Sequence, residues 1–158
     1  EEWIFEAQPK IFIKLFGTRI QAAIDHLRYY ANNSLILLIR KQTKEGLKYE
    51  PENWYISREE EFYYILGILN SQLISYYYKT LFKQTHVRGN FLQFYIKDLN
   101  NIPLMIPNQT NISNMKKIAV VAQKLTEFYR SAKLKSNEIG KLEKKLNMLV
   151  KKLHKTLD

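Results

Sequence analysis

Short runs of β-branched and aromatic residues dominate the chain from position 10 to 39, and turn-forming residues separate them. The runs occupy 10–16, 20–24, 29–30 and 34–39, and the residues between them include Gly17-Thr18-Arg19, Asp25-His26 and Asn32-Asn33. β-Branched and aromatic side chains favour strands, whereas Gly, Asn and Asp favour tight turns. The pattern therefore predicts an antiparallel meander of three or four strands, followed by a polar segment at 41–57.

A helical pattern begins after Ser57. Ser57 and Glu60 have the spacing of a capping box, in which the hydroxyl of Ser57 accepts from the Glu60 amide and the Glu60 carboxylate accepts from the Ser57 amide. Apolar residues then recur every three or four positions, with acidic residues in the first turn and basic residues in the last. We predict one helix over 58–83. Gly67 inside it costs about 1 kcal/mol relative to Ala, so we expect a neighbouring element to cross closely there.

Three consecutive tyrosines, Tyr76-Tyr77-Tyr78, lie in this predicted helix. Three successive helical residues span about 200° of the helix surface, so they cannot all face one core. At least one ring is expected at the surface, with its hydroxyl available to a polar partner such as phosphate. Packing against the strands and the C-terminal helix is the alternative.

The second half of the chain alternates loop, extended and helical patterns. Residues 84–90 predict a polar loop, 91–96 a strand, and the proline-bracketed segment 102–107 an extended conformation. From Ile118 to Leu153 the apolar residues keep one spacing of three and four. That spacing fits either one long helix or a hairpin broken at Ser136-Asn137 or at Gly140.

Together these patterns predict an α+β fold: an antiparallel twisted β meander packed on a central helix, followed by a basic C-terminal helix or helical hairpin. We divide the chain into a domain of residues 1–110 and a helical tail of residues 111–158 that acts as a spacer or docking arm. The first residue is not Met, so we expect the chain to be a piece of a longer protein.

The charge is unevenly distributed. The 158 residues include 25 Lys and Arg against 15 Asp and Glu, a formal net charge of +10. Residues 1–114 carry 13 basic and 11 acidic groups, net +2, whereas residues 115–158 carry 12 and 4, net +8. Such a surplus favours polyanionic partners such as nucleic acid, and most of it belongs to the predicted tail.

Several classes of chemistry are excluded by what the sequence lacks. Without cysteine there is no disulfide, no cysteine nucleophile and no thiolate zinc site. Phosphate-binding Gly-rich loops, nucleophile elbows and metal-ligand spacings do not occur, and the three His residues are scattered. We therefore expect neither catalytic residues nor a metal site in this chain alone. No apolar run is long enough to span a bilayer, so we expect a cytoplasmic protein with no membrane partner.

The stretch from 79 to 93 holds residue types that proteins use to bind duplex DNA. Arg can pair with guanine, Asn and Gln can pair with adenine, and Lys and Thr suit phosphates. The alternative, which composition alone favours, is a polar connection that is merely solvated.

The order of several motifs resembles a known family. Tyr-Ile-Leu-Gly-Ile-Leu-Asn-Ser-Gln-Leu-Ile at 64–74 is followed by Leu-Asn-Asn-Ile-Pro-Leu at 99–104. This order is similar to that in target-recognition domains of bacterial restriction–modification enzymes. These are the Taq-type specificity domains at the C-terminus of adenine-specific DNA methyltransferases and type IIG restriction enzymes, which are related to type I specificity subunits. One departure is the last helix, where Asn147 stands in place of the family's acidic residue.

The resemblance implies that the chain reads a short sequence of double-stranded DNA while another domain performs the chemistry. In the family that domain binds S-adenosylmethionine and methylates adenine through an Asn/Asp-Pro-Pro-Tyr/Phe motif, which is absent here. S-Adenosylmethionine, and Mg²⁺ where the enzyme also cleaves, would therefore belong to the rest of the implied enzyme. The expected partners are double-stranded DNA and a methyltransferase domain of the parent chain or of a partner subunit.

On this hypothesis the 84–93 loop and the turn at Gly17-Thr18-Arg19 bind the DNA, and Arg88 is the first candidate for a base contact. The expected DNA-binding residues are Arg88, His86, Asn90, Gln84, Thr85, Gln93, Lys83, Lys79, Arg19, Thr18 and Lys14. A second hypothesis is a helical assembly module, in which the apolar positions from Ile118 to Leu153 dock another subunit or form a helix-mediated dimer without reading DNA.

Overall fold

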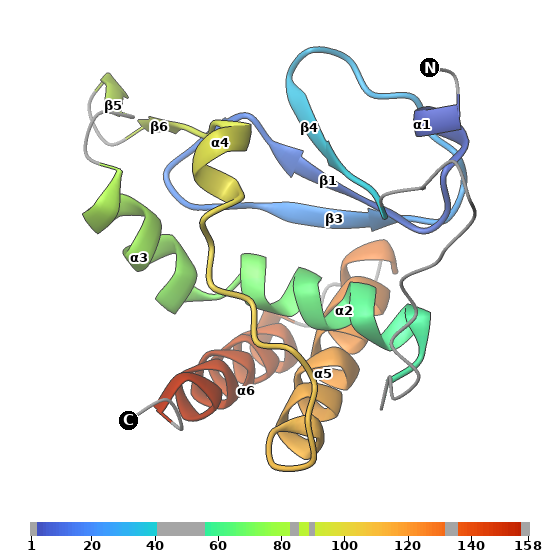
Figure 1. Ribbon diagram of the computed structural model, residues 1–158, viewed down its shortest axis with the longest axis vertical. Coiled ribbons are helices and arrows are strands. Elements are labelled where there is room, and N and C mark those ends of the chain that lie inside the picture. The colour runs from blue at the N-terminus through green and yellow to red at the C-terminus, as the bar shows by residue number, and fades with distance from the viewer. Residues whose placement is uncertain (1–2, 41–55, 83–85, 89–90, 132–135, 156–158) are drawn as a thin grey trace.

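The structure is a computed structural model that describes residues 3–40, 56–82, 91–131 and 136–155, together with the backbone of 86–88. Antiparallel strands in two small sheets combine with helices, which confirms the predicted α+β class. In Figure 1 the larger sheet, helix α2 (Arg58–Leu69) and a pair of C-terminal helices form successive layers. The short helix α1 (Trp3–Glu6) precedes the first strand.

The larger sheet contains β1 (Lys10–Lys14), β3 (Ala22–Asp25) and β4 (Leu35–Leu38), in the order β3-β1-β4. Both pairs are antiparallel, and Ile11 lies opposite Ile24 on one side and Leu38 on the other. This order differs in detail from the predicted meander, in which each strand would pair with the next in sequence. Ile11 and Ile13 are almost fully buried, so β1 takes the centre, whereas β4 is half-buried along its length and forms an edge.

The strand predicted at 29–30 is absent, because Asp25 holds this segment in a turn. Its carboxylate accepts from the backbone amides of Leu27 at 2.7 Å and Tyr29 at 2.9 Å. Asp25 is itself buried beside Lys10, whose Nζ lies 3.3 Å from its Oδ2 and also donates to the Phe5 carbonyl. Tyr29 and Tyr30 are left exposed on the loop.

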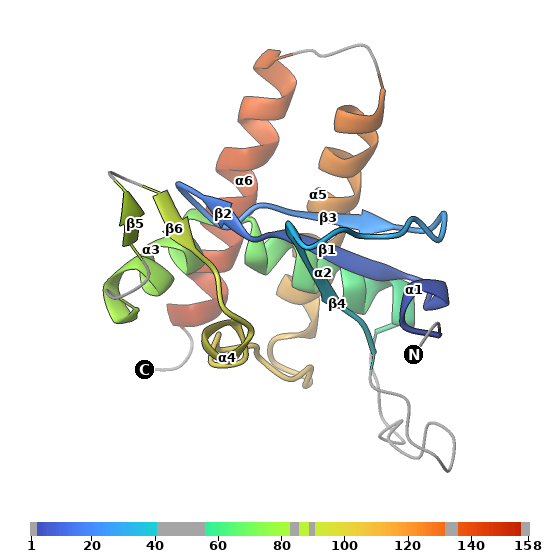
Figure 2. The ribbon, with the colours of Figure 1, turned by 90° about the horizontal axis from the view of Figure 1, so that it is seen from above.

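The smaller sheet joins distant parts of the chain. β2 (Phe16–Gly17) pairs with β6 (Phe91–Gln93), which pairs with β5 (His86–Arg88), as Figure 2 shows from above. The strand predicted at 91–96 ends at Gln93, and the short helix α4 (Ile96–Leu99) follows. The strand is shorter than predicted because the Tyr95 amide donates to the hydroxyl of Tyr78, at 3.2 Å, and not to a neighbouring strand.

The helix predicted over 58–83 is two helices, α2 and α3 (Gln72–Leu81). Its capping box is confirmed, since the Ser57 amide donates to Glu60 Oε2 at 2.7 Å and the Glu60 amide to Ser57 Oγ at 3.2 Å. The break follows from two side chains. Ser71 Oγ accepts from the Ile74 amide at 3.2 Å and so caps α3. Asn70 bonds both the amide and the carbonyl of Ala22 in β3, each at 2.9 Å.

The segment between α4 and the C-terminal helices is neither helix nor strand at 103–108, in agreement with the non-helical conformation expected from its prolines. It crosses in front of α2 in Figure 1. The Met105 amide donates to the Tyr64 hydroxyl at 3.3 Å, which fastens the segment to α2. Burial raises the pKa of Tyr64 to about 12.

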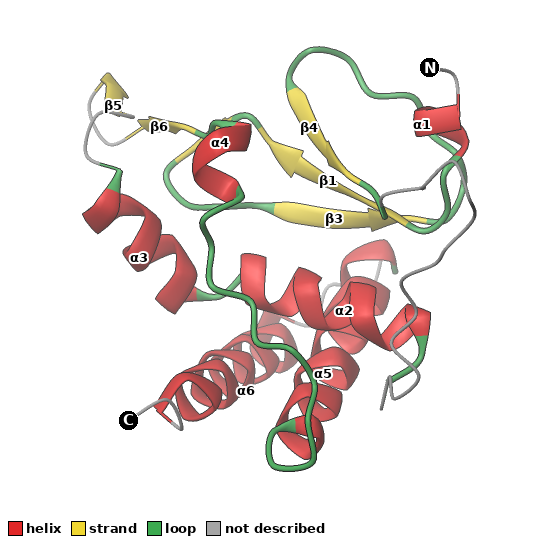
Figure 3. Cartoon of the chain, in the orientation of Figure 1, coloured by secondary structure: helices red, strands yellow, loops and turns green. Residues whose placement is uncertain are grey.

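The C-terminal segment is a hairpin of α5 (Ile112–Arg130) and α6 (Ser136–His154), which pack on each other and on α2 (Figure 3). The hairpin alternative is therefore confirmed, but the break predicted at Ser136-Asn137 or Gly140 is wrong, because α5 ends at Arg130 and these residues belong to α6. Helix α6 starts at Ser136 and contains Gly140. The close crossing expected at Gly67 is also confirmed, because a Cβ added there would lie 2.7 Å from Ile118 Cγ2 and 3.2 Å from Leu146 Cδ1.

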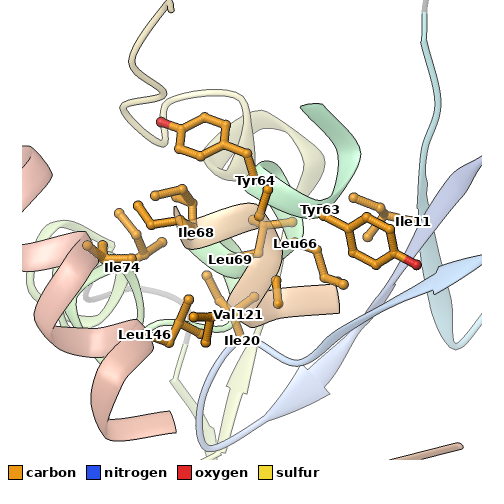
Figure 4. Packing of buried hydrophobic residues seen from close by; sticks show 14 of the residues in the cluster. Ile11, Ile20, Tyr63, Tyr64, Leu66, Ile68, Leu69, Ile74, Val121 and Leu146 are labelled. Atoms are coloured by element: carbon orange, nitrogen blue, oxygen red, sulfur yellow. The ribbon is translucent and has the colours of Figure 1, made fainter. Parts of the chain in front are cut away.

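The buried apolar side chains form one cluster to which the strands, α2 and the hairpin all contribute. Figure 4 shows Leu66 and Leu69 of α2 in this cluster together with Ile20 from the strand side and Val121 and Leu146 from the hairpin. The division into residues 1–110 and 111–158 stays a prediction, and within the described residues both parts supply this core.

Candidate nucleic-acid interface

The smaller sheet brings together the two segments from which DNA-binding residues were expected. Across its strands Phe16 lies opposite Gln93, Gly17 opposite Leu92, His86 opposite Leu92, and Arg88 opposite Phe91. The turn with Thr18 and Arg19 therefore starts beside β6. Only the backbone is described at His86 and Arg88, and the predicted residues Lys83, Gln84, Thr85 and Asn90 lie outside the described residues.

One face of this sheet is buried and the other exposes aromatic rings. Leu92 is fully buried, whereas Phe91 is 56% exposed and Gln93 is half-buried. Phe16, opposite Gln93, is 42% exposed. The exposed face thus combines two phenyl rings with an amide. Phe16 and Phe91 were not among the residues expected to bind DNA, although side chains alternate between the two faces of a strand, which places Phe91 and Gln93 on the face opposite to Leu92.

Tyr78 of α3 fixes this sheet against the helices. Its ring is fully buried, and its hydroxyl lies 3.4 Å from both the Gln93 carbonyl and a carboxylate oxygen of Asp98, besides accepting from Tyr95. Burial raises the pKa of Tyr78 to about 12, and the nearby Asp98 carboxylate adds to the rise. The hydroxyl therefore stays protonated and ties the end of β6 and the start of α4 to α3.

The tyrosine triplet is divided between core and surface, as its spacing predicts. Tyr78 is buried, Tyr77 is half-buried, and Tyr76 is 69% exposed. Lys79, the next residue of α3, is also exposed. Helix α3 thus presents an aromatic ring and a cation to solvent.

The remaining predicted residues lie at different places around the strands. Lys14 is exposed at the end of β1, and Thr18 is exposed in the turn after β2. Arg19 extends toward α6, where its Nη2 lies 4.0 Å from Glu143 Oε1, and Tyr129 Oη donates to the same oxygen at 2.9 Å. These side chains border a cavity of about 440 Å³ between β3, α2 and the hairpin. Arg19 is thus placed where the strands meet the hairpin.

Two further ionisable residues noted in the sequence, Glu60 and His26, make contacts within the fold. Glu60 completes the capping box, and the ring of His26 lies 3.5 Å from the Tyr63 hydroxyl. Within the described ranges no three His, Cys, Asp or Glu side chains are grouped to hold a metal. Every helix that the structure describes is too short or too polar to cross a membrane.

Residues 1–104 match the family described as the TaqI-like C-terminal specificity domain. The chain belongs to this family. The match contains the Leu-Gly-Ile-Leu-Asn-Ser block at 66–71, which forms the end of α2 and the cap of α3, and it ends with the Ile-Pro-Leu at 102–104. The resemblance inferred from these motifs is thereby confirmed.

The chain is also similar to a protein of Methanocaldococcus jannaschii whose name describes a type II restriction enzyme and methyltransferase. The two are 34% identical over 150 residues. The alignment covers 93% of this chain but 11% of that protein. The chain therefore corresponds to a small part of this much longer relative.

Proposed function

We propose that this chain binds double-stranded DNA and recognises a short base sequence in it, as the specificity domain of a restriction–modification adenine methyltransferase or type IIG restriction enzyme. Family membership and the named activity of the relative support the proposal. The observation that carries it is the pairing of β2 with β6, which unites two chain segments rich in DNA-binding residue types.

The short strands of the smaller sheet support a role in direct readout. The major groove of DNA admits a narrow β-ribbon, and each base pair presents a distinct set of donors and acceptors there. In the proposal Arg88, with Gln84, Asn90 and Gln93, contacts base edges. The phosphate contacts come from Lys14, Thr18, Arg19, Lys79, Lys83, Thr85 and His86, which position the sheet without reading sequence.

Phe16 and Phe91 extend this proposal to a third kind of contact. Their exposed rings lie on one face of the sheet, on β2 and β6. The only apolar group that base pairs present in the major groove is the 5-methyl of thymine, and phenyl rings pack on it. We therefore expect the recognised sequence to contain a thymine in contact with this face.

The chemistry of the complete enzyme is assigned to other parts of it. This chain corresponds to 11% of its relative's length. In the proposal, a methyltransferase domain of the parent chain or of a partner subunit binds S-adenosylmethionine, and Mg²⁺ serves any cleavage. The chain itself contributes specificity and no catalytic residue.

The proposal is tested by selecting bound duplexes from a library with a randomised centre. We expect enrichment of one short motif. Arg88→Ala should then cost about 1–3 kcal/mol in binding and relax one base position, whereas Lys83→Ala should weaken all sequences alike. Enrichment of no motif would contradict the proposal, and equal losses on motif and scrambled duplex for Arg88→Ala would contradict its assignment as a base contact.

The assembly hypothesis receives less support from the packing. Ile118, Leu146 and Leu153, which were expected to form a docking seam, are buried within the chain itself. A helix-mediated dimer would therefore have to use other residues. It remains a prediction that sedimentation of the chain would check.

A further inference from the structure

A basic groove lies along the C-terminal half of α6, beside the start of α3. Its volume is about 700 Å³, and Gln72, Asn147, Met148 and four lysines line it. The lysines are Lys144, Lys151, Lys152 and Lys155, and all four are exposed. The opposite side of α6 packs into the core through buried leucines. The groove is therefore an outward surface of a firmly held helix.

The charge of this groove is uncompensated in the part of the chain that the structure describes. No acidic residue lines it, and neither of the two ion pairs among the described residues involves its lysines. Met148, which is 61% exposed, lines the groove together with the lysines. Lysine side chains can cover apolar surface with their stems while their ammonium groups stay in water. Like charges held close together repel one another, so an anion placed between them relieves the repulsion.

The groove is connected to the smaller sheet through α3. Asn147 Oδ1 accepts from the Gln72 amide at 2.8 Å, which joins α6 to the first residue of α3. At the far end of α3, Tyr78 holds β6 in place. In both Figure 1 and Figure 2, β5, β6, α3 and the C-terminal end of α6 lie on one side of the molecule. Lys79, in the last turn of α3, is exposed.

We propose that this groove binds the phosphate backbone of the duplex that the smaller sheet reads, at positions beyond the recognised base pairs. The inference rests on the proposed function and adds a second, sequence-independent contact to it. Lysine suits this role because its ammonium group is a mobile point charge, whereas base recognition favours the planar fork of arginine. The DNA phosphates match the groove in charge.

The test compares two charge-matched variants of the chain. Lys144→Gln/Lys151→Gln/Lys155→Gln removes three of the four lysine charges of the groove. Lys116→Gln/Lys117→Gln/Lys124→Gln removes the same charge from exposed positions on α5. Affinity is measured by fluorescence anisotropy between about 50 and 200 mM salt. One duplex holds only the selected motif, and a second adds about one helical turn, roughly 10 base pairs, on each side.

On the longer duplex, the groove variant should show a slope of log affinity against log salt that is shallower by roughly 2–3 units, because each phosphate contact contributes about 0.9. The sequence of the flanks should not matter. On the short duplex the groove variant should behave like the α5 variant, which should keep the wild-type slope on both. Thermal unfolding monitored by circular dichroism confirms that both variants fold.

The outcomes separate this inference from the function on which it rests. If wild-type chain selects a motif but the groove variant keeps the wild-type slope, the groove inference is wrong and the proposed function stands. The groove inference is also wrong, and the proposed function also stands, if the salt slopes of the groove and α5 variants become shallower by the same amount. If wild type binds no duplex, both fail. Polyglutamate serves as a probe for acidic polypeptides. If the groove variant keeps the wild-type slope on DNA but loses binding to polyglutamate, the groove is assigned to a protein partner and the inference is overturned.

Discussion

Phe91 shows how the environment of a single residue defines its role. Burying a phenyl ring stabilises a protein by about 1.5–3 kcal/mol, yet Phe91 is 56% exposed while its neighbour Leu92 is fully buried. A shift of one residue in strand register would exchange the two. The pairing of Gly17 with Leu92 fixes the register, so the ring stays outside. An aromatic side chain held in this position is available to a ligand.

At this scale we predict that Phe91 senses a thymine methyl group. Replacing that thymine of the selected motif by uracil removes one methyl, worth about 0.8 kcal/mol, and should weaken wild-type binding roughly fourfold. Phe91→Ala should bind more weakly and no longer distinguish the two duplexes. Competition binding with both duplexes measures the difference. Tyr30→Ala, which removes an exposed ring from a loop outside the smaller sheet, is the matched control. The prediction would be contradicted if wild type bound the thymine and uracil duplexes equally well at every thymine position of the motif.

Among the elements, those specified by neighbouring residues could be predicted and those specified by distant ones could not. The capping box at Ser57 depends on Glu60, three residues away, and was visible in the sequence. The break between α2 and α3 depends on Asn70, whose partner Ala22 lies 48 residues away, and was missed. The order β3-β1-β4 was likewise missed, because the apolar pattern of a strand does not name its neighbour.

In the candidate site, too, the features specified by neighbouring residues could be predicted and those specified by distant residues could not. The residue types at 79–93 and at the 17–19 turn were visible, and so was the family resemblance. Their union in one sheet depends on the pairing of Phe16 with Gln93, which no local pattern encodes. Tyr78 was expected only as one of three tyrosines, and its contacts with Tyr95 and Asp98 emerged from the fold.

At the scale of elements, we predict opposite effects for two glycine substitutions. Gly67→Ala should lower the free energy of unfolding by about 1–3 kcal/mol, because its Cβ would meet Ile118 at 2.7 Å, and overpacking outweighs the gain in helix propensity. Gly140→Ala, inside α6 with nothing within 4 Å of the added Cβ, should raise it by up to about 1 kcal/mol. Urea unfolding measures both. A stabilising Gly67→Ala would show that α5 can move away from α2.

For the whole molecule, the arrangement of charge matters more than its total. The chain has a net charge of +10, of which residues 115–158 hold +8. In the sequence this surplus belongs to a tail. In the fold, the C-terminal end of α6 and the smaller sheet lie on one side of the molecule (Figure 2), and the lysine groove lies along that part of α6. In the proposals made above, the nearly neutral segment contacts the bases of a duplex and the strongly basic helix contacts the phosphates of the same duplex.

The stability of the whole chain should depend on pH through His154, at the end of α6. Burial lowers the pKa of this histidine from its usual 6.5, and its Nε2 is buried with no hydrogen-bond partner among the described residues. Between the lowered pKa of the folded chain and the usual 6.5, the unfolded chain therefore binds more of this proton than the folded chain does. The free energy of unfolding should consequently fall as the pH decreases through about 6.5, by less than about 1.4 kcal/mol per pH unit because a single proton is involved.

Urea unfolding of wild type and His154→Leu across this range measures the effect, and the variant should show the smaller slope. Glu61 acts in the opposite direction at lower pH. Burial raises its pKa despite the nearby Arg40 and Arg58, so the folded chain binds that proton first and gains stability as the pH falls. Because Glu61 is present in both proteins, the difference between their slopes reports His154 alone. Identical slopes would show that the histidine ring is solvated in the folded chain.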